Sequence, residues 1–132
     1  EKYRKALLIN DSQALFYSGL GMALLKANNY RAAINNLEAG VKKDPELYKP
    51  KLYLGIGLVE THDWIPAAGY LSQAIEILPT RALTYYYRGL AYEGLNSTTR
   101  AIQDYRTVLS LAPGTELAEK AKTRLIRLGR FS

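Results

Sequence analysis

Apolar residues recur along this chain at the spacing of one face of an α-helix. In residues 14–27, and again in residues 30–43, they follow the i, i+3, i+4, i+7 pattern. Asn28-Asn29 interrupts the pattern, and Asn29 is a suitable N-cap for the second stretch. The sequence predicts two helices joined by a tight turn. Their apolar positions are Tyr17, Leu20 and Leu24 in the first helix, and Ala33, Ile34, Leu37 and Val41 in the second.

The same two-helix pattern returns along the chain at one fixed interval. Four columns keep this interval: a glycine, an alanine, a large apolar or aromatic residue, and a proline. The chain therefore divides into three units, 14–47, 48–81 and 82–115, with residues 1–13 before them and 116–132 after them. The columns are Gly21, Gly55 and Gly89; Ala33, Ala67 and Ala101; Leu37, Leu71 and Tyr105; and Pro45, Pro79 and Pro113.

The glycine column has a steric interpretation. A residue without a side chain, midway along the first helix of each pair, lets the second helix approach closely. The alternative is a glycine-rich phosphate loop. It fails because Gly19-Leu20-Gly21 and Gly55-Ile56-Gly57 lack a third glycine and a preceding strand. We expect the glycines to serve helix packing.

The columns resemble the signature of the tetratricopeptide repeat family, in which about 34 residues form one helix–turn–helix unit. The resemblance covers residues 14–115, and Gly40, Lys51 and Arg88 depart from it. It implies an all-α, right-handed α–α superhelix (a solenoid) of three helix pairs, without any β-sheet. The residues that carry it are Tyr17, Leu20, Gly21, Leu24, Ala33, Leu37 and Pro45; Leu54, Gly55, Leu58, Ala67, Leu71, Ala74 and Pro79; and Tyr85, Gly89, Tyr92, Ala101, Tyr105 and Pro113.

Residues 1–13 continue the repeat phase backwards. Tyr3, Leu7 and Ile9 precede Asp11 much as the apolar residues of the first unit precede Pro45. We expect this segment to be the tail of the second helix of a truncated repeat. Its uncovered apolar face would favour self-association through the N-terminal end. The chain does not begin with methionine, so we expect it to be an excised or processed part of a longer protein.

The C-terminal segment 116–132 predicts a capping helix. Thr115 is a suitable N-cap, and Gly129 is a suitable stop. One face of this helix is apolar and the other polar, as the terminal helix of a repeat stack requires for solubility. The apolar face consists of Leu117, Ala118, Ala121, Leu125 and Leu128.

Composition narrows the possible chemistry. The 132 residues are 48% apolar and 23% charged, which indicates a folded globular chain. The absence of cysteine excludes disulfides, thiol nucleophiles and cysteine-based zinc sites, and fits the cytoplasm without fixing the compartment. The single histidine, His62, lies in a predicted turn. No apolar stretch approaches the ~20 residues of a membrane span.

No catalytic arrangement emerges from the sequence. There is no carboxylate pair, no nucleophile–base set and no phosphate loop. We therefore predict that this chain is not an enzyme and uses no cofactor and no metal.

Much of the net charge of +6 comes from five basic residues near the C-terminus. One interpretation is a solvated capping helix with cations near its C-terminal end, where the helix dipole favours them. The other is an electrostatic patch for an acidic protein, anionic lipid or nucleic acid. We favour the solvated helix, and we do not expect nucleic acid because the helix lacks stacking aromatics. The basic patch is Lys120, Lys122, Arg124, Arg127 and Arg130.

The first helix of each unit has a second face that its partner helix does not need. Residues 48–61 are apolar nearly all round, although a one-layer solenoid has nothing behind this helix. We predict a groove for a peptide or helix on the concave face. The alternative is that missing segments of the chain, or a second copy, fill it. Leu25, Lys26 and Glu60 share these helix faces. The predicted groove residues are Met22, Leu52, Tyr53, Ile56, Leu83, Tyr86, Tyr87 and Leu90.

The family that the chain resembles includes a special case, a basic clamp for the acidic C-terminus of heat-shock chaperones. The clamp uses lysine, asparagine and arginine side chains at five positions. None of the residues at the matching positions here supplies such contacts, so we expect no chaperone clamp. These residues are Ser18, Met22, Tyr53, Leu83 and Tyr87.

The function predicted from the sequence is a non-catalytic protein–protein interaction module whose partner is a protein or peptide. Two alternatives remain open. The chain could be a docking or regulatory appendage of a larger enzyme, or it could bind an acidic partner or nucleic acid through its basic C-terminal helix.

Overall fold

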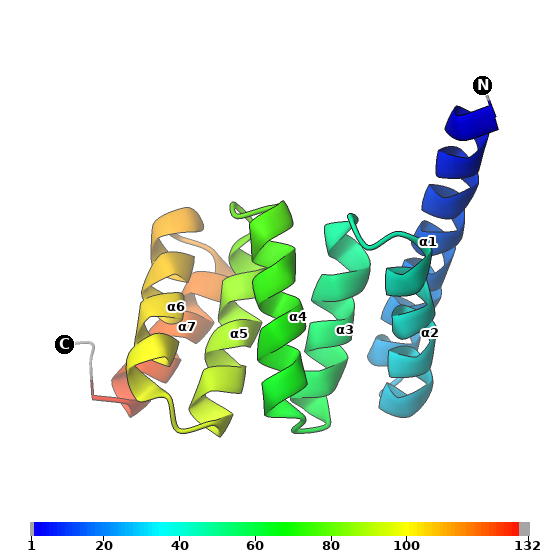
Figure 1. Ribbon diagram of the computed structural model, residues 1–132. Helices are drawn as coiled ribbons and strands as arrows, with labels where there is room; N and C mark the ends of the chain where they lie inside the picture. The colour runs from blue at the N-terminus through cyan, green and yellow to red at the C-terminus, as the bar shows by residue number, and fades with distance from the viewer. Residues whose placement is uncertain (1, 130–132) are drawn as a thin grey trace.

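The computed structural model describes the backbone of residues 2–129 and the side chains of residues 12–129. This part of the chain forms seven α-helices and no β-strand (Figure 1). The prediction of an all-α superhelical repeat is confirmed. The helices are α1 (Lys2–Lys26), α2 (Tyr30–Lys43), α3 (Tyr48–Glu60), α4 (Trp64–Ile77), α5 (Ala82–Gly94), α6 (Thr98–Leu111) and α7 (Glu116–Arg127).

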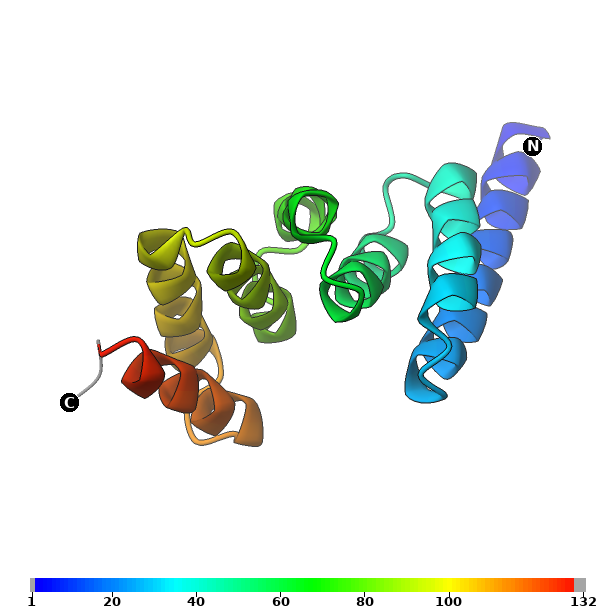
Figure 2. The same cartoon turned by 90° about the horizontal axis from the view of Figure 1, so that it is seen from below.

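The helices pack as pairs that stand side by side in one row (Figures 1 and 2). α1 pairs with α2, α3 with α4 and α5 with α6, and each pair packs against the next. On one side of the row α1 contacts α3, α3 contacts α5 and α5 contacts α7. In the described part of the chain, α2, α4 and α6 make no such contacts with one another. The row therefore curves toward the odd-numbered helices, whose free sides form its concave face.

In each pair, a large side chain of the second helix occupies the space beside a glycine of the first. A Cβ added at Gly55 would clash with Leu71, and one added at Gly89 would lie 2.6 Å from Tyr105 Cε1. Leu71 and Tyr105 are both 0% exposed. The steric interpretation of the glycine column is confirmed. The three contacts are Gly21 with Leu37, Gly55 with Leu71 and Gly89 with Tyr105.

The turn inside each pair is built on one residue with left-handed backbone. Asn28, His62 and Asn96 have φ angles of 60°, 63° and 60°. After Asn28, the N–H of Asn29 donates to Leu24 O at 2.8 Å, which closes the helix C-terminus in a Schellman pattern. The expected side-chain cap of Asn29 does not form. Its φ of −94° and ψ of 74° lie outside the extended region typical of N-caps.

The N-terminal segment differs from the expected tail of a separate helix. α1 runs without a break from Lys2 to Lys26 and projects beyond the row in Figure 1. In the other repeats a proline follows the second helix, but the equivalent position one repeat before Pro45 is Asp11. Asp11 can continue a helix where proline cannot, so nothing stops α1 there.

The capping helix forms as predicted, and a polar network attaches it. Thr115 Oγ1 accepts a hydrogen bond from Ala118 N at 3.1 Å. Arg124 donates to both carboxylate oxygens of Glu93 at 2.9 and 2.8 Å. Tyr105 Oη donates to the same carboxylate at 2.6 Å. Glu93 therefore joins α5, α6 and α7. The apolar face of α7 is buried at Ala118, Ala121 and Leu125.

A second ion pair explains why the repeat accepts Arg88 at a position that is commonly apolar. Arg88 donates to both carboxylate oxygens of Asp104 at 2.9 and 2.7 Å, and to Ser72 Oγ at 3.2 Å. The guanidinium also lies 5.7 Å from the ring centroid of Tyr85 and 5.5 Å from that of Tyr92. Arg88 thus links α4, α5 and α6 instead of weakening their packing.

The glycine contacts lead to a stability prediction. Gly55→Ala should lower the free energy of unfolding by about 1–2 kcal/mol. Overpacking a core typically costs about 1–3 kcal/mol, and the higher helix propensity of alanine offsets part of that cost. Urea unfolding followed by circular dichroism measures the change.

Gly69 provides the matched control for this substitution. It is an exposed residue inside α4, and a Cβ added there meets nothing within 4 Å. Gly69→Ala should therefore raise the free energy of unfolding by about 0.5–1 kcal/mol. Equal effects at the two positions would show that the Gly55 contact is not a packing constraint.

The Glu93 network leads to a pH prediction. Burial alone would raise the pKa of Glu93, but the hydrogen bonds from Arg124 and Tyr105 and the charge of Arg124 outweigh it, so the pKa lies below its ordinary value of 4.5. A carboxylate with a lowered folded-state pKa contributes stability above its unfolded-state pKa and loses it as the pH falls through the folded-state value.

We therefore expect the thermal midpoint to drop as the pH falls below about 4.5. Glu93→Gln should flatten this drop, whereas Glu76→Gln, at an exposed position on α4, should leave it unchanged. Parallel pH profiles for the parent protein and Glu93→Gln would contradict this role for the network.

Candidate functional site

A cavity of about 330 Å³ opens between α1, α3 and α5, the helices of the concave face. Its walls are mainly apolar and aromatic, with one lysine and one glutamate. We call it the central cavity. It is lined by Met22, Leu25, Lys26, Asn28, Tyr30, Tyr53, Ile56, Glu60, Leu83 and Tyr87.

The structure brings five of the eight predicted groove residues to this cavity. They come from three different repeats. Four of them are half-buried, whereas Tyr53 is 9% exposed and also belongs to the apolar core. Asn28 and Tyr30 were not predicted, because they belong to the turn and to the second helix of the first unit. The five residues are Met22, Tyr53, Ile56, Leu83 and Tyr87.

The other three predicted groove residues lie elsewhere. Leu52 is 0% exposed and belongs to the core, so it cannot form the floor of a groove. Tyr86 turns toward α6, with its ring centroid 5.9 Å from that of Tyr105, and packs edge-on against Tyr87. Leu90 lines a different cavity. Because α3 is apolar nearly all round, periodicity could not separate its core face from its groove face.

A second cavity, of about 380 Å³, lies next to the first. We call it the distal cavity. Trp64 forms part of its wall. Its ring stacks on the His62 ring, with the two ring centroids 4.8 Å apart, and it also fills the space where Gly94 lacks a side chain. The missing side chain of Gly94 therefore leaves no empty space in the groove, because the Trp64 ring occupies it. The lining is Val59, Glu60, His62, Trp64, Leu90, Glu93, Gly94 and Arg124.

The phenols of the groove stay neutral at physiological pH. Burial raises the pKa of Tyr87, and the negative charge of Glu60 raises it further. Burial also raises the pKa of Tyr53, although Arg81 partly offsets this effect. Neutral phenols can donate hydrogen bonds and offer large apolar faces, a combination typical of recognition surfaces.

The predicted basic patch does not form one free cationic surface. Arg124 is paired with Glu93, and Lys122 lies 3.3 Å from Glu119. Lys120 and Arg127 are exposed. Arg130 lies outside the described residues. Two of the five cations are thus already paired with carboxylates of the chain.

The first helix also carries an uncovered apolar face at the N-terminal end of the row. Phe16 is 67% exposed and Leu20 is 39% exposed. One repeat later, Pro50 and Leu54 occupy the matching positions and are buried against the preceding helix pair. The residues first predicted for this end, Tyr3, Leu7 and Ile9, have side chains outside the described part of the chain.

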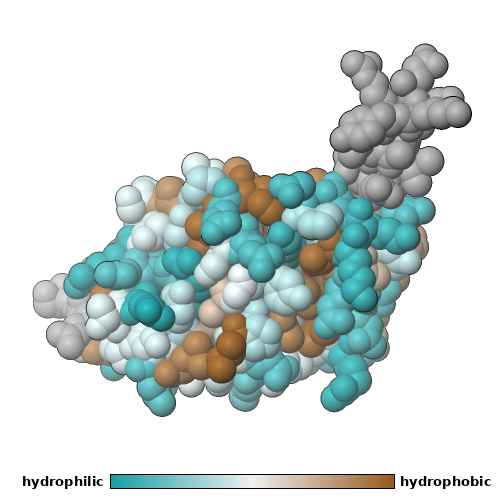
Figure 3. Space-filling model, in the orientation of Figure 1, coloured by the Kyte–Doolittle hydropathy of each residue, from teal (hydrophilic) through white to brown (hydrophobic). Residues whose placement is uncertain are grey.

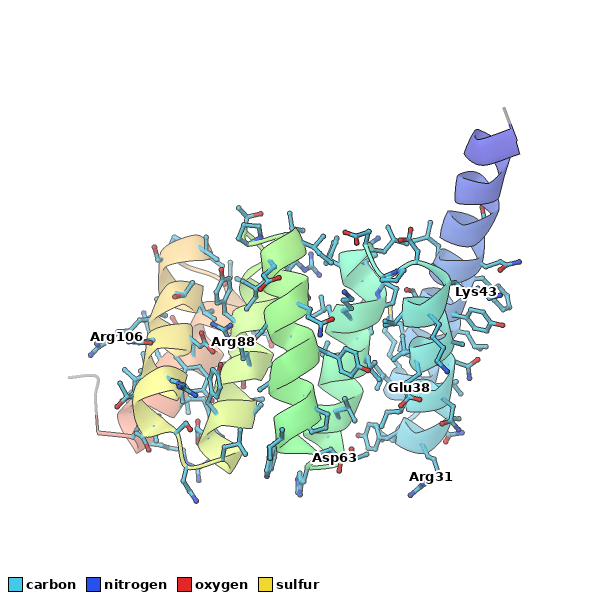
Figure 4. The ribbon with its side chains drawn as sticks, in the orientation of Figure 1. Arg31, Glu38, Lys43, Asp63, Arg88 and Arg106 are labelled. Carbon is cyan, nitrogen blue, oxygen red and sulfur yellow. The ribbon has the colours of Figure 1, made fainter. Side chains whose placement is uncertain are left out.

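The opposite face of the row has a different character. Figure 3 shows hydrophilic side chains over most of this face, with the hydrophobic ones in separate small groups. In Figure 4, Arg31, Glu38 and Lys43 follow one another along α2, and Arg106 extends from α6.

The side chains also bear on metal binding and on membrane insertion. Among the described residues, no three His, Cys, Asp or Glu side chains gather in a way that could hold a metal ion. No helix in the described part combines the length and apolar character that crossing a membrane requires.

Comparison with known proteins finds similarity to tetratricopeptide repeat proteins, both in sequence and in fold. A tetratricopeptide repeat family model matches residues 82–115, the third predicted unit. A curated relative, the UDP-N-acetylglucosamine--peptide N-acetylglucosaminyltransferase of Giardia intestinalis (strain ATCC 50803 / WB clone C6), is 33% identical over 94 residues. That match covers 71% of this chain, which spans 6% of the relative's length.

Solved structures share the fold over nearly the whole chain. The Arabidopsis OM64 TPR domain superposes with a TM-score of 0.83 at 23% identity, covering 90% of this chain and 98% of that one. The first TPR of Spaghetti (RPAP3), bound to the HSP90 peptide SRMEEVD, superposes with a TM-score of 0.82 at 21% identity. The match covers 89% of this chain and 94% of that one. With its repeated helix pairs, glycine contacts and matching family model, this chain belongs to the tetratricopeptide repeat family.

Proposed function

We propose that this chain is a non-catalytic interaction module that holds a peptide or helix of another protein in the central cavity. The observation that carries the proposal is the lining of this cavity. Met22, Ile56, Leu83 and Tyr87 present apolar surface to an open space on the concave face. Apolar surface of this kind, framed by polar groups, marks binding sites on soluble proteins.

The proteins of similar fold support peptide binding as the mode of action. The first TPR of Spaghetti (RPAP3) holds an HSP90 peptide, and the second TPR domain of human RPAP3 holds the HSP70 peptide SGPTIEEVD. A curved stack of helix pairs offers an extended concave surface for such segments. We transfer this mode of binding, and not the identity of the peptide, to the present chain.

The ligand should differ from an acidic chaperone tail. Four of the five positions that would form a basic clamp line the central cavity here, and they hold Met22, Tyr53, Leu83 and Tyr87. The fifth, Ser18, is 3% exposed. Without cations at these positions, a terminal carboxylate would be desolvated without compensation. An apolar segment suits the same surface.

A second candidate function is docking within a larger enzyme. The observation that favours it is the 33% identity to part of a glycosyltransferase. In that arrangement the groove would hold a segment of the enzyme's protein substrate. The sequence of the full-length gene would decide between a docking module and a free-standing adaptor.

The proposal predicts which side chains matter for binding. Peptides selected on the protein from a random library should bind Tyr87→Ala at least tenfold more weakly, about 1.4 kcal/mol, because burial against a large aromatic side chain is worth more than an exposed ion pair. Calorimetric titration gives the affinities, and circular dichroism checks that the helices persist.

Exposed cations provide the controls for this test. Lys120→Ala and Arg127→Ala should leave the affinity within twofold, because neither residue lines the central or the distal cavity. The peptide SRMEEVD should bind no better than a scrambled version of itself. If Tyr87→Ala binds normally while the α7 variants fail, the binding site is the basic helix and not the groove.

We also propose that two copies associate through the Phe16 and Leu20 face. The matching face of the next repeat, at Pro50 and Leu54, is covered by a helix pair. The Phe16 and Leu20 face therefore has a shape on which a helix of a second copy can pack. Phe16→Asp should shift the mass distribution toward monomer in sedimentation at micromolar concentration. Ile65→Asp, at a residue of α4 that is 73% exposed, is the control. A parent protein that is already monomeric across this range would rule the pairing out.

A further inference from the structure

Glu60 is the carboxylate that the central and distal cavities share. It lines the central cavity together with Tyr87 and the distal cavity together with Trp64. Its side chain is exposed, and none of the ion pairs or side-chain hydrogen bonds formed within residues 12–129 involves it. Glu93, the other glutamate of the distal cavity, is already bound by Arg124 and Tyr105.

No cation within residues 12–129 forms an ion pair with Glu60. It is the last residue of α3, where the helix dipole places partial negative charge. The last turn of α3 contains no basic residue that would offset this effect. A cation brought by a ligand could therefore pair with this carboxylate without displacing a partner from within residues 12–129.

The surroundings of Glu60 suit a cationic side chain with apolar neighbours. Burial, followed by the charge of Glu60, raises the pKa of Tyr87, so this ring stays neutral and keeps the electron-rich face that attracts cations. Each of the two cavities that Glu60 lines also offers apolar surface, from Ile56 in the central cavity and from Leu90 in the distal cavity. Lys26, the cation of the central cavity, belongs to α1 and is not paired with Glu60.

We infer that the groove selects peptide segments in which one lysine or arginine pairs with Glu60 between two apolar side chains. One apolar side chain enters the central cavity, and the other lies over Leu90 in the distal cavity. This inference rests on the proposed function and specifies the chemistry of its ligand. It opposes the simple expectation from the net charge of +6, which favours an acidic partner.

Selection from a random peptide library tests the inference. Peptides selected on the parent protein should be enriched in a lysine or arginine flanked by apolar residues. The enrichment should disappear with Glu60→Gln and turn into an enrichment of aspartate or glutamate with Glu60→Lys. Glu76→Gln makes the same charge change at an exposed position outside both cavities, and should select the same peptides as the parent.

Affinities of matched peptides complete the test. Replacing the selected basic residue with glutamine should weaken binding to the parent about threefold, as expected for a solvent-exposed ion pair, and should not change binding to Glu60→Gln. Circular dichroism verifies that each variant retains its helices.

The outcomes separate the inference from the proposed function. Selected peptides that are apolar but show no preference for a cation, or that prefer an acid, would overturn the role of Glu60 and leave the groove as the binding site. Failure to select any peptide, or selected peptides that bind Tyr87→Ala as tightly as the parent, would overturn the proposed function and the inference with it.

Discussion

The contact between a glycine and a large side chain of the partner helix fixes how the two helices of each repeat meet. At Gly55 the second helix comes so close that Leu71 occupies the space of a missing side chain. Gly89 and Tyr105 repeat the contact with an aromatic ring. Because both residues belong to one repeat, the contact needs no distant part of the chain. Repeated in all three units, it gives each pair similar geometry, and the stack acquires its curvature from the small rotation between successive repeats.

This arrangement also determines where a binding surface can form. The odd-numbered helices turn their glycine-containing faces toward their partners and touch one another along one side of the row. Their remaining faces are not needed for pairing, and they enclose the central cavity. Tyr87 and Met22 lie there without filling the core of any pair. Aromatic residues at such positions increase the apolar surface exposed to solvent, a cost that a binding role would explain.

The sequence predicts those parts of the structure that depend on periodicity. The glycine contacts, the capping helix and five cavity residues all follow from spacing along one helix face. The prediction for Leu52 was wrong because α3 is apolar nearly all round, so spacing could not say which side faces the core. The pairs of Arg88 with Asp104 and Arg124 with Glu93 join residues 16 and 31 positions apart, on different helices, and leave no periodic signal. Likewise, α1 passes Asp11 because a missing proline removes the stop, which the repeat phase alone does not reveal.

These ion pairs change how the charge of the molecule should be interpreted. The net charge of +6 and the basic terminal helix suggest attraction to anions. However, Arg124 and Arg88 are both held by carboxylates that tie helices together, so their charges serve the fold. The electrostatic potential on the concave face is set by a few local groups, because water and salt screen the more distant charges. Local pairing, rather than net charge, therefore sets the electrostatic character of the concave face.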